Sequence, residues 1–173
     1  HVYIQHGLHS LQPYAGTIRV FELGFGTGLN AYLLLEEVLQ TPGLVIEYTG
    51  LEPSPLPEHL LSQIHFKGYR TDDFMALHQS NESPFNLKQT LEDFLPEKAF
   101  DLIFYDAFAP TVQPELWSES TLARIVEMMR PNAVWVSYCA KGSVRRCLQN
   151  LGLQVFRMPG ALTKKHMLRA IKV

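Results

Sequence analysis

Glycines alternate with other residues in the segment FELGFGTGLN, residues 21–30, which also carries an acidic residue near its start. Glycine permits positive φ angles and lets the backbone come close to a ligand, and a helix that starts after such a loop offers unpaired N–H groups. The spacing G-x-G-x-G lacks the G-x-x-G interval of dinucleotide-binding loops, so it favours a nucleoside ligand without pyrophosphate over a merely tight turn. The residues predicted to hold this ligand are Glu22, Gly24, Phe25, Gly26, Thr27, Gly28 and Asn30.

Acidic residues also follow two later strand-like stretches. Glu52 directly follows the stretch 45–51 and is placed to accept hydrogen bonds from both ribose hydroxyls of a bound nucleoside. The alternative is a surface carboxylate. It is disfavoured because the three prolines that follow, at positions 53, 55 and 57, fix the backbone around Glu52. Glu92 or Asp93 is predicted to approach the adenine amino group, with a short helix as an equal alternative.

Short β-branched or aromatic stretches alternate with stretches of helical spacing from residue 18 onward, which is typical of an α/β fold. We expect strands over 18–23, 45–51, 85–89, 100–105, 133–138, 153–157 and 167–173. The expected helices cover 29–39, 58–65, 72–78, 114–129 and 143–151. No repeat or linker interrupts this order, so the sequence predicts one domain over residues 1–173: a doubly wound sheet with helices on both sides.

The composition narrows the class of protein. A hydrophobic fraction of 46% and an aromatic fraction of 11% predict a globular core rather than a disordered chain. Cys139 and Cys147 follow no metal-ligand spacing, so no metal site is expected, and no apolar stretch approaches the roughly 18 residues of a bilayer span. We expect a cytoplasmic enzyme. Because the chain opens at His1, we also expect an N-terminal segment to be absent or shortened.

The charges are distributed unevenly, although the formal net charge is only −2. No Asp or Glu follows Glu127, so the C-terminal third is basic. Such an asymmetry indicates a face that binds a polyanion, or a solvated surface whose balancing acids lie elsewhere in the fold.

Four segments together resemble one family, the MnmC-type tRNA methyltransferases: FELGFGTGLN, YDAFAPTVQPELW, SYCAKGSVRRCLQ and PGALTKKHM. Its members show an E-x-GFGTGLN loop, a DAFAP-x-x-x-P-x-x-W segment, a G-x-V-(R/K)-R helix start and a PG-x-x-x-KREM-like element. The resemblance covers residues 20–170, and the DAFAP segment is its most specific part. His166 departs from the acidic residue of the last element, and we expect neither the fused flavin domain of some members nor an FAD site.

The resemblance implies a Rossmann-like class I methyltransferase sheet, mostly parallel with an antiparallel C-terminal strand. It implies S-adenosylmethionine as cofactor and the 5-aminomethyl group of the wobble uridine of tRNA, with or without a 2-thio group, as methyl acceptor. The tRNA anticodon arm is then the expected partner. Basic residues expected to contact its phosphates are Lys141, Arg145, Arg146, Lys164 and Lys165.

Asp106 follows the apolar stretch 100–105. In the methyltransferase that the resemblance implies, this position lies beside the site expected for the transferred methyl group. We hypothesise that it hydrogen-bonds the substrate amine and helps take its proton, while Phe108 and Pro110 shape the wall around the base. A carboxylate favours the protonated ammonium, which cannot attack, so positioning is expected to outweigh base catalysis. The alternative role for Asp106 is a helix N-cap. We interpret Trp117 as a core residue rather than a base-stacking one.

Other functions stay open. One is a methyltransferase for a small amine or carboxylate, and another is a non-catalytic module that binds S-adenosylmethionine or tRNA. A nicotinamide dehydrogenase is disfavoured by the glycine spacing. The choice of tRNA, the 2-thio group and the oligomeric state are left open by the sequence.

Overall fold

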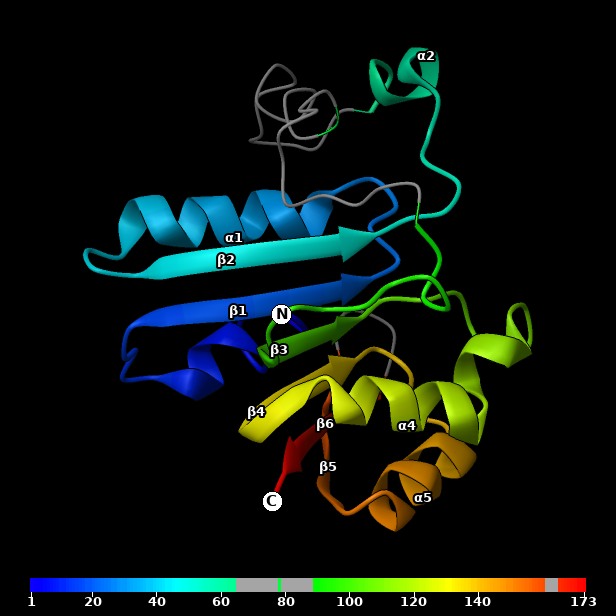
Figure 1. The fold of residues 1–173 in the computed structure, drawn as a ribbon. Coiled ribbons are helices and arrows are strands. Elements are labelled where there is room, and N and C mark those ends of the chain that lie inside the picture. The colour runs from blue at the N-terminus through cyan, green and yellow to red at the C-terminus, as the bar shows by residue number, and fades with distance from the viewer. Residues whose placement is uncertain (65–77, 79–88, 161–164) are drawn as a thin grey trace.

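The computed structural model describes residues 1–64, 78, 89–160 and 165–173, and these residues form a six-stranded sheet (Figure 1). The strand order is β2-β1-β3-β4-β6-β5. The strands are β1 Thr17–Leu23, β2 Val45–Leu51, β3 Phe100–Tyr105, β4 Met129–Ser137, β5 Leu153–Pro159 and β6 His166–Lys172. Strands β2, β1, β3 and β4 run parallel, whereas β6 pairs antiparallel with both β4 and β5. The predicted parallel sheet with an antiparallel C-terminal strand is therefore confirmed.

The helices follow the predicted order with two differences in extent. They are α1 Leu29–Gln40, α2 Glu58–Leu61, α4 Glu119–Glu127 and α5 Gly142–Asn150, with 3₁₀ turns η1 Leu8–Leu11 and η2 Pro114–Trp117. The helix predicted over 114–129 is thus divided, because Ser118 takes an extended conformation and caps α4 by accepting a hydrogen bond from the Thr121 N–H at 3.2 Å. Helix α2 is shorter than the predicted 58–65. The elements predicted over 72–78 and 85–89 lie almost entirely outside the described residues.

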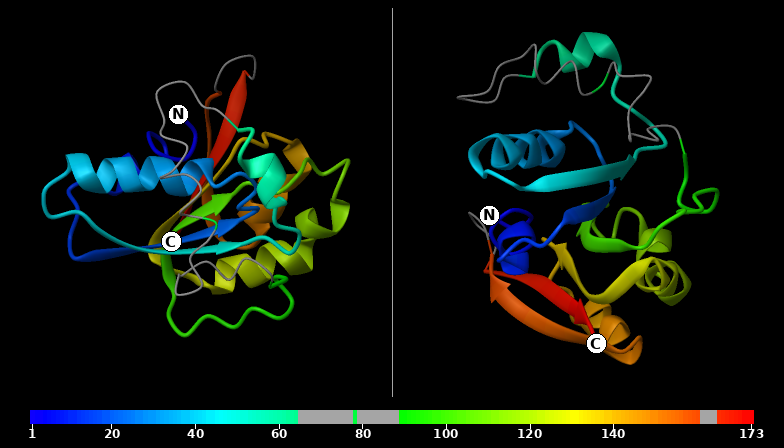
Figure 2. Two further views of the ribbon diagram at one scale, coloured as in Figure 1. Left: turned by 90° about the horizontal axis from the view of Figure 1, so that it is seen from above. Right: turned by 60° about the vertical axis from the view of Figure 1, so that its left-hand side comes forward.

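Two hydrophobic layers cover the two faces of the sheet, because successive strand residues point to opposite faces. In β3, Leu102 and Phe104 pack with α1, whereas Ile103 and Tyr105 pack with α4 and α5. Figure 2 shows these helices on opposite sides of the sheet. No helix in the described part of the chain combines the length and apolar character of a membrane span.

The N-terminal residues belong to the layer on the α1 face. Four side chains of residues 1–11 are buried there: Val2, Tyr3, Ile4 and Leu8. The Tyr3 ring packs against Phe104 with the ring centroids 5.1 Å apart. The sequence predicts no helix or strand over these residues, yet they help to build the core next to the end of β3.

Candidate functional site

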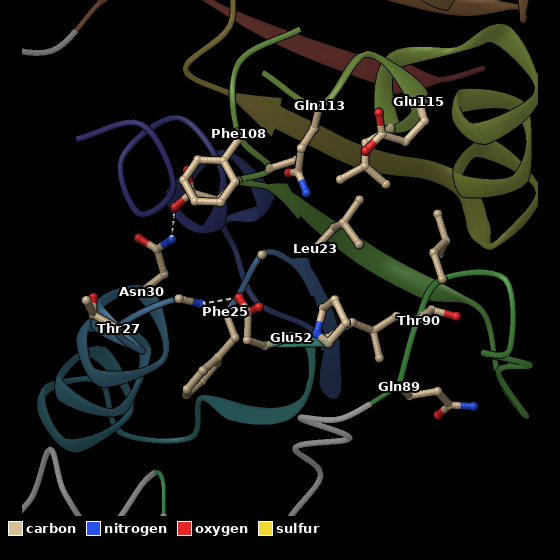
Figure 3. Close-up of a pocket in the computed structure, with 18 of the residues that line it drawn as sticks. Leu23, Phe25, Thr27, Asn30, Glu52, Gln89, Thr90, Phe108, Gln113 and Glu115 are labelled. Atoms are coloured by element: carbon tan, nitrogen blue, oxygen red, sulfur yellow. Dashed lines mark hydrogen bonds between the residues drawn. The ribbon is translucent and has the colours of Figure 1, made fainter. Parts of the chain in front are cut away.

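A cavity of about 410 Å³ opens where β1, β2 and β3 end, which is where parallel α/β sheets bind their ligands (Figure 3). This volume lies within the rough range of small-molecule sites, 300–1,000 Å³. The loop between β1 and α1 forms one wall, and the residues that follow β3 form another. The predicted site residues in its walls are Gly24, Phe25, Gly26, Thr27, Asn30, Glu52, Glu92, Asp106 and Phe108.

The glycine loop takes a path that other residues cannot follow without strain. Gly24, Gly26 and Gly28 have φ angles of +90°, +53° and +79°. A Cβ atom at Gly24 would lie 2.6 Å from the carbonyl oxygen of Asp106, so the loop touches the end of β3. At Gly26 no described atom lies within 4 Å of such a Cβ, which leaves the backbone open to a ligand.

Glu52 ties the end of β2 to this loop. Its Oε2 accepts a hydrogen bond from the Gly26 N–H at 3.0 Å, and its Oε1 accepts one from the Ser54 N–H at 3.1 Å. A carboxylate has about four lone-pair sites, so Glu52 can also accept bonds from a ligand's hydroxyl groups. The carboxylate lies in the cavity wall, as Figure 3 shows.

Glu22 lies behind the glycine loop rather than in the cavity wall, with its side chain fully buried. The Asn30 Nδ2 donates to its Oε1 at 2.6 Å, and the Tyr48 hydroxyl donates to its Oε2. Burial raises the pKa of the Glu22 carboxyl to about 8, although both donors act in the opposite direction. Glu22 therefore supports the loop from within, and its predicted direct contact with a ligand stays a prediction.

The raised pKa of Glu22 makes stability depend on pH. Between about pH 4.5 and pH 8 the folded protein keeps this proton while the unfolded chain releases it, so the contribution to stability is lost as the pH rises. Compared with Glu22→Gln, the wild type should lose free energy of unfolding between pH 5 and pH 8, by up to about 1.4 kcal/mol per pH unit. Urea denaturation at several pH values measures this difference.

The exposed Glu97 offers a matched control for this titration. Glu97→Gln changes the same chemical group at the surface and should show no such pH-dependent difference from the wild type. Parallel pH profiles for the wild type and Glu22→Gln would contradict a protonated, buried Glu22.

Asp106 follows β3 and reaches the cavity wall with both carboxylate oxygens engaged. The Tyr3 hydroxyl donates to Oδ1 at 2.7 Å, and the Asn30 Nδ2 donates to Oδ2 at 3.0 Å. Asn30 therefore joins Asp106 to the buried Glu22. The N-cap alternative for Asp106 is wrong, because the next helical turn, η2, has no side-chain cap bond and α4 is capped by Ser118.

The residues after Asp106 form a loop that two aromatic side chains hold in place. The Tyr138 hydroxyl donates to the Ala107 carbonyl at 2.7 Å, and the Trp117 Nε1 donates to the Phe108 carbonyl at 2.7 Å. With its backbone fixed in this way, Phe108 projects a side chain that is 67% exposed at the cavity. Trp117 is buried as predicted, and it also anchors this loop.

Besides Glu22, three residues predicted for the cofactor or catalytic site lie outside the cavity wall: Gly28, Asp93 and Pro110. The Asp93 carboxylate accepts a hydrogen bond from the Thr90 Oγ1 at 2.8 Å. Glu92 does line the cavity, and its carbonyl accepts a hydrogen bond from Arg124 at 3.2 Å. Among the described residues there is no group of side chains that could hold a metal ion.

Those predicted basic residues that the structure describes gather beyond the same edge of the sheet. Lys141 follows β4 and precedes α5, and Lys165 directly precedes β6. Because Ser137 of β4 pairs with Leu168 of the antiparallel β6, both lysines lie at the edge where Asp106 follows β3. Lys141, Arg146 and Lys165 are exposed and Arg145 is partly buried, whereas Lys164 lies outside the described residues.

Three tyrosines of the site were missed from the sequence. Tyr48 and Tyr138 both lie within predicted strands, 45–51 and 133–138, so the strand patterns indicated their place but not their partners. Tyr3 precedes every predicted element, and its contact with Asp106 joins residues 103 positions apart. No local pattern could have indicated it.

Comparison with known proteins gives one family. A family model described as S-adenosyl-L-methionine-dependent methyltransferase matches residues 78–173, more than half of the chain. The tRNA 5-methylaminomethyl-2-thiouridine biosynthesis bifunctional protein MnmC of Campylobacter hominis is 28% identical, over 87% of this chain and 25% of its own. The protein of the same name from Pseudomonas paraeruginosa is 30% identical, over 85% of this chain and 26% of its own.

A solved structure agrees with these relatives. The crystal structure of MNMC2 from Aquifex aeolicus matches with a TM-score of 0.73 and 27% identity, over 90% of this chain and 53% of that chain. The present chain thus spans about a quarter of the length of the curated relatives and about half of the Aquifex chain.

Proposed function

Because the chain belongs to the S-adenosyl-L-methionine-dependent methyltransferase family, we propose that it methylates the aminomethyl nitrogen of 5-aminomethyluridine, with or without a 2-thio group, at the tRNA wobble position. The observation that carries this proposal is the position of Asp106, which shares one cavity wall with the exposed Phe108 and touches the glycine loop. A carboxylate beside an exposed aromatic ring suits an amine carried on a planar base. The names of the relatives, which refer to biosynthesis of 5-methylaminomethyl-2-thiouridine in tRNA, support this choice of substrate.

The cavity has the donors, acceptors and apolar surface that S-adenosylmethionine requires. Glu52 would accept hydrogen bonds from the ribose hydroxyls, and the open backbone at Gly26 would allow the cofactor to approach closely. Leucines line the cavity at positions 23, 51, 91 and 116 and would contact the adenine ring. When bound, the cofactor supplies an electrophilic methyl group, whose bond to sulfur breaks as the amine nitrogen bonds to it.

Asp106 would act mainly by orienting the amine. A lone pair on nitrogen must point at the methyl carbon, and holding it there replaces a random encounter by a near-attack geometry. The nitrogen must also lose one proton, which the Asp106 carboxylate is placed to accept. Because a carboxylate favours the charged ammonium while desolvation favours the neutral amine, a closed site around Phe108 would shift the balance toward the attacking form.

The basic residues at the same edge would position the tRNA anticodon arm. The C-terminal third carries no acid after Glu127, and the exposed Lys141, Arg146 and Lys165 lie beyond the carboxyl ends of the strands. Cations that contact phosphates fix the register of a nucleic acid without reading its sequence. A tRNA substrate agrees with the cytoplasmic location expected from the sequence.

Salt dependence tests the tRNA surface. Affinity for tRNA should fall steeply with salt, and the combined variant Lys141→Gln, Arg146→Gln and Lys165→Gln should have a log–log slope shallower by about 2. Filter binding at 50–300 mM KCl measures the slopes. The control is Lys98→Gln, which removes an exposed cation just before β3 begins, and it should keep the wild-type slope. A tRNA affinity independent of salt would contradict the proposal.

Mass spectrometry of tRNA nucleosides tests the reaction itself. Incubation of tRNA bearing 5-aminomethyluridine with the protein and S-adenosylmethionine should add one methyl group to that nucleoside. Methylation of free amines with none on tRNA would support a small-molecule methyltransferase instead. Cofactor binding without any turnover would support a binding module.

A further inference from the structure

The first residues of the chain follow a tightly constrained path next to the site. The Tyr3 carbonyl accepts a hydrogen bond from the Leu8 N–H at 3.0 Å, and the Ile4 carbonyl accepts one from the His9 N–H at 2.9 Å. A Cβ atom at Gly7 would lie 2.1 Å from the Tyr3 carbonyl oxygen and 3.1 Å from the Phe104 ring, so this turn is pressed against β3. The Tyr3 side chain is thus held by backbone bonds and by packing.

This path brings the Tyr3 hydroxyl to the carboxylate that the proposed reaction uses. The hydroxyl donates to Asp106 Oδ1 at 2.7 Å, while Asn30 donates to Oδ2 at 3.0 Å. Two donors, one on each oxygen, fix the rotation of the carboxylate plane, which one donor would leave free to turn. The donors come from two separate segments, the N-terminal residues and α1, which pack on the same face of the sheet.

Both donors are neutral, which preserves the charge of Asp106. An Arg or Lys in the place of Tyr3 would form an ion pair and compete with a substrate ammonium for the carboxylate. Burial, together with the nearby Asp106, raises the pKa of the Tyr3 hydroxyl well above its usual range. The hydroxyl therefore remains a donor at every pH at which the protein would work.

We propose that Tyr3 is a positioning residue for methyl transfer: its hydroxyl holds the Asp106 carboxylate in the orientation that receives the substrate amine, so residues 1–11 form part of the active site. This inference rests on the proposed function. Asp106 contacts the amine, and Tyr3 acts through Asp106. Asn30 completes the arrangement by linking the carboxylate to the buried Glu22 behind the cofactor loop.

Tyr3→Phe tests this role because it removes the hydroxyl and keeps the ring that packs on Phe104. The kcat for tRNA methylation should fall about tenfold, a change typical of losing a hydrogen bond to a charged group. The KM values for tRNA and S-adenosylmethionine and the melting temperature should stay close to those of the wild type. Tyr14→Phe, which removes a hydroxyl from a partly buried tyrosine that does not line the cavity, is the matched control.

A second measurement needs no turnover. In protein labelled with 3-fluorotyrosine, the ¹⁹F resonance missing from Tyr3→Phe identifies Tyr3, and Asp106→Asn should shift that resonance while leaving the Tyr14 resonance in place. An unmoved Tyr3 resonance would overturn the inference, as would a Tyr3→Phe kcat equal to that of an active wild type. A wild type that methylates no tRNA, with the resonance shifting as expected, would instead refute the proposed function.

Discussion

Asp106→Asn is expected to lower the kcat of tRNA methylation by about 100-fold or more, while S-adenosylmethionine still binds with nearly wild-type affinity. The amide is close in shape to the carboxylate, but it has no negative charge and cannot take a proton from the substrate amine. In the wild type the Tyr3 hydroxyl and the Asn30 amide each donate to a carboxylate oxygen of Asp106. In the variant, the new NH₂ group would replace one of these oxygens and so face a donor instead of accepting from it. Single-turnover kinetics with saturating cofactor measures the loss.

Asp101 provides the control at the other end of the same strand. It accepts hydrogen bonds from the Arg19 N–H at 2.8 Å and from the Arg130 side chain at 2.9 Å, away from the cavity. Asp101→Asn should leave kcat within about twofold of the wild type, even if the melting temperature falls through the weakened pair with Arg130. Full turnover by Asp106→Asn with bound tRNA and cofactor would show that Asp106 is not catalytic.

Gly24→Ala is expected to raise the Kd for S-adenosylmethionine by about tenfold or more. The new Cβ would meet the Asp106 backbone at 2.6 Å, so the glycine loop or the end of β3 must shift, and both line the cavity. Overpacking typically costs about 1–3 kcal/mol, and about 1.4 kcal/mol corresponds to a tenfold change in Kd. Isothermal titration calorimetry measures the affinity, and urea denaturation measures the stability.

Gly152→Ala separates this overlap from backbone strain. Gly152 has a similar φ of +86°, but a Cβ there would meet no described atom within 4 Å. The control should therefore lose only the roughly 1–2 kcal/mol of unfolding free energy that the left-handed conformation costs, and it should bind the cofactor normally. Equal cofactor affinities for the two variants would contradict a role for the close approach at Gly24.

The positions of the main strands and of the cofactor loop followed from local patterns. The bounds predicted for β2 and β3 agree with the structure. Short apolar stretches bounded by glycines, prolines and charged residues are typical of buried strands, and the bounding residues mark where each strand ends. Once these strands are taken as parallel, their carboxyl ends meet at one edge, so Gly24, Glu52 and Asp106 come together. The departure over 114–129 arose because helical periodicity does not reveal that Ser118 is extended.

The amino-acid sequence by itself determined the α/β class, the glycine loop and the acidic residues at the strand ends, since each depends on neighbours a few positions away. Only the tertiary structure decided which of these groups touch. It placed Glu22 behind the loop, made Trp117 an anchor for Phe108, and brought Tyr3 to Asp106 across a separation of 103 residues. Such contacts depend on how the N-terminal residues, helices and strands pack together, and no spacing along the chain encodes that packing.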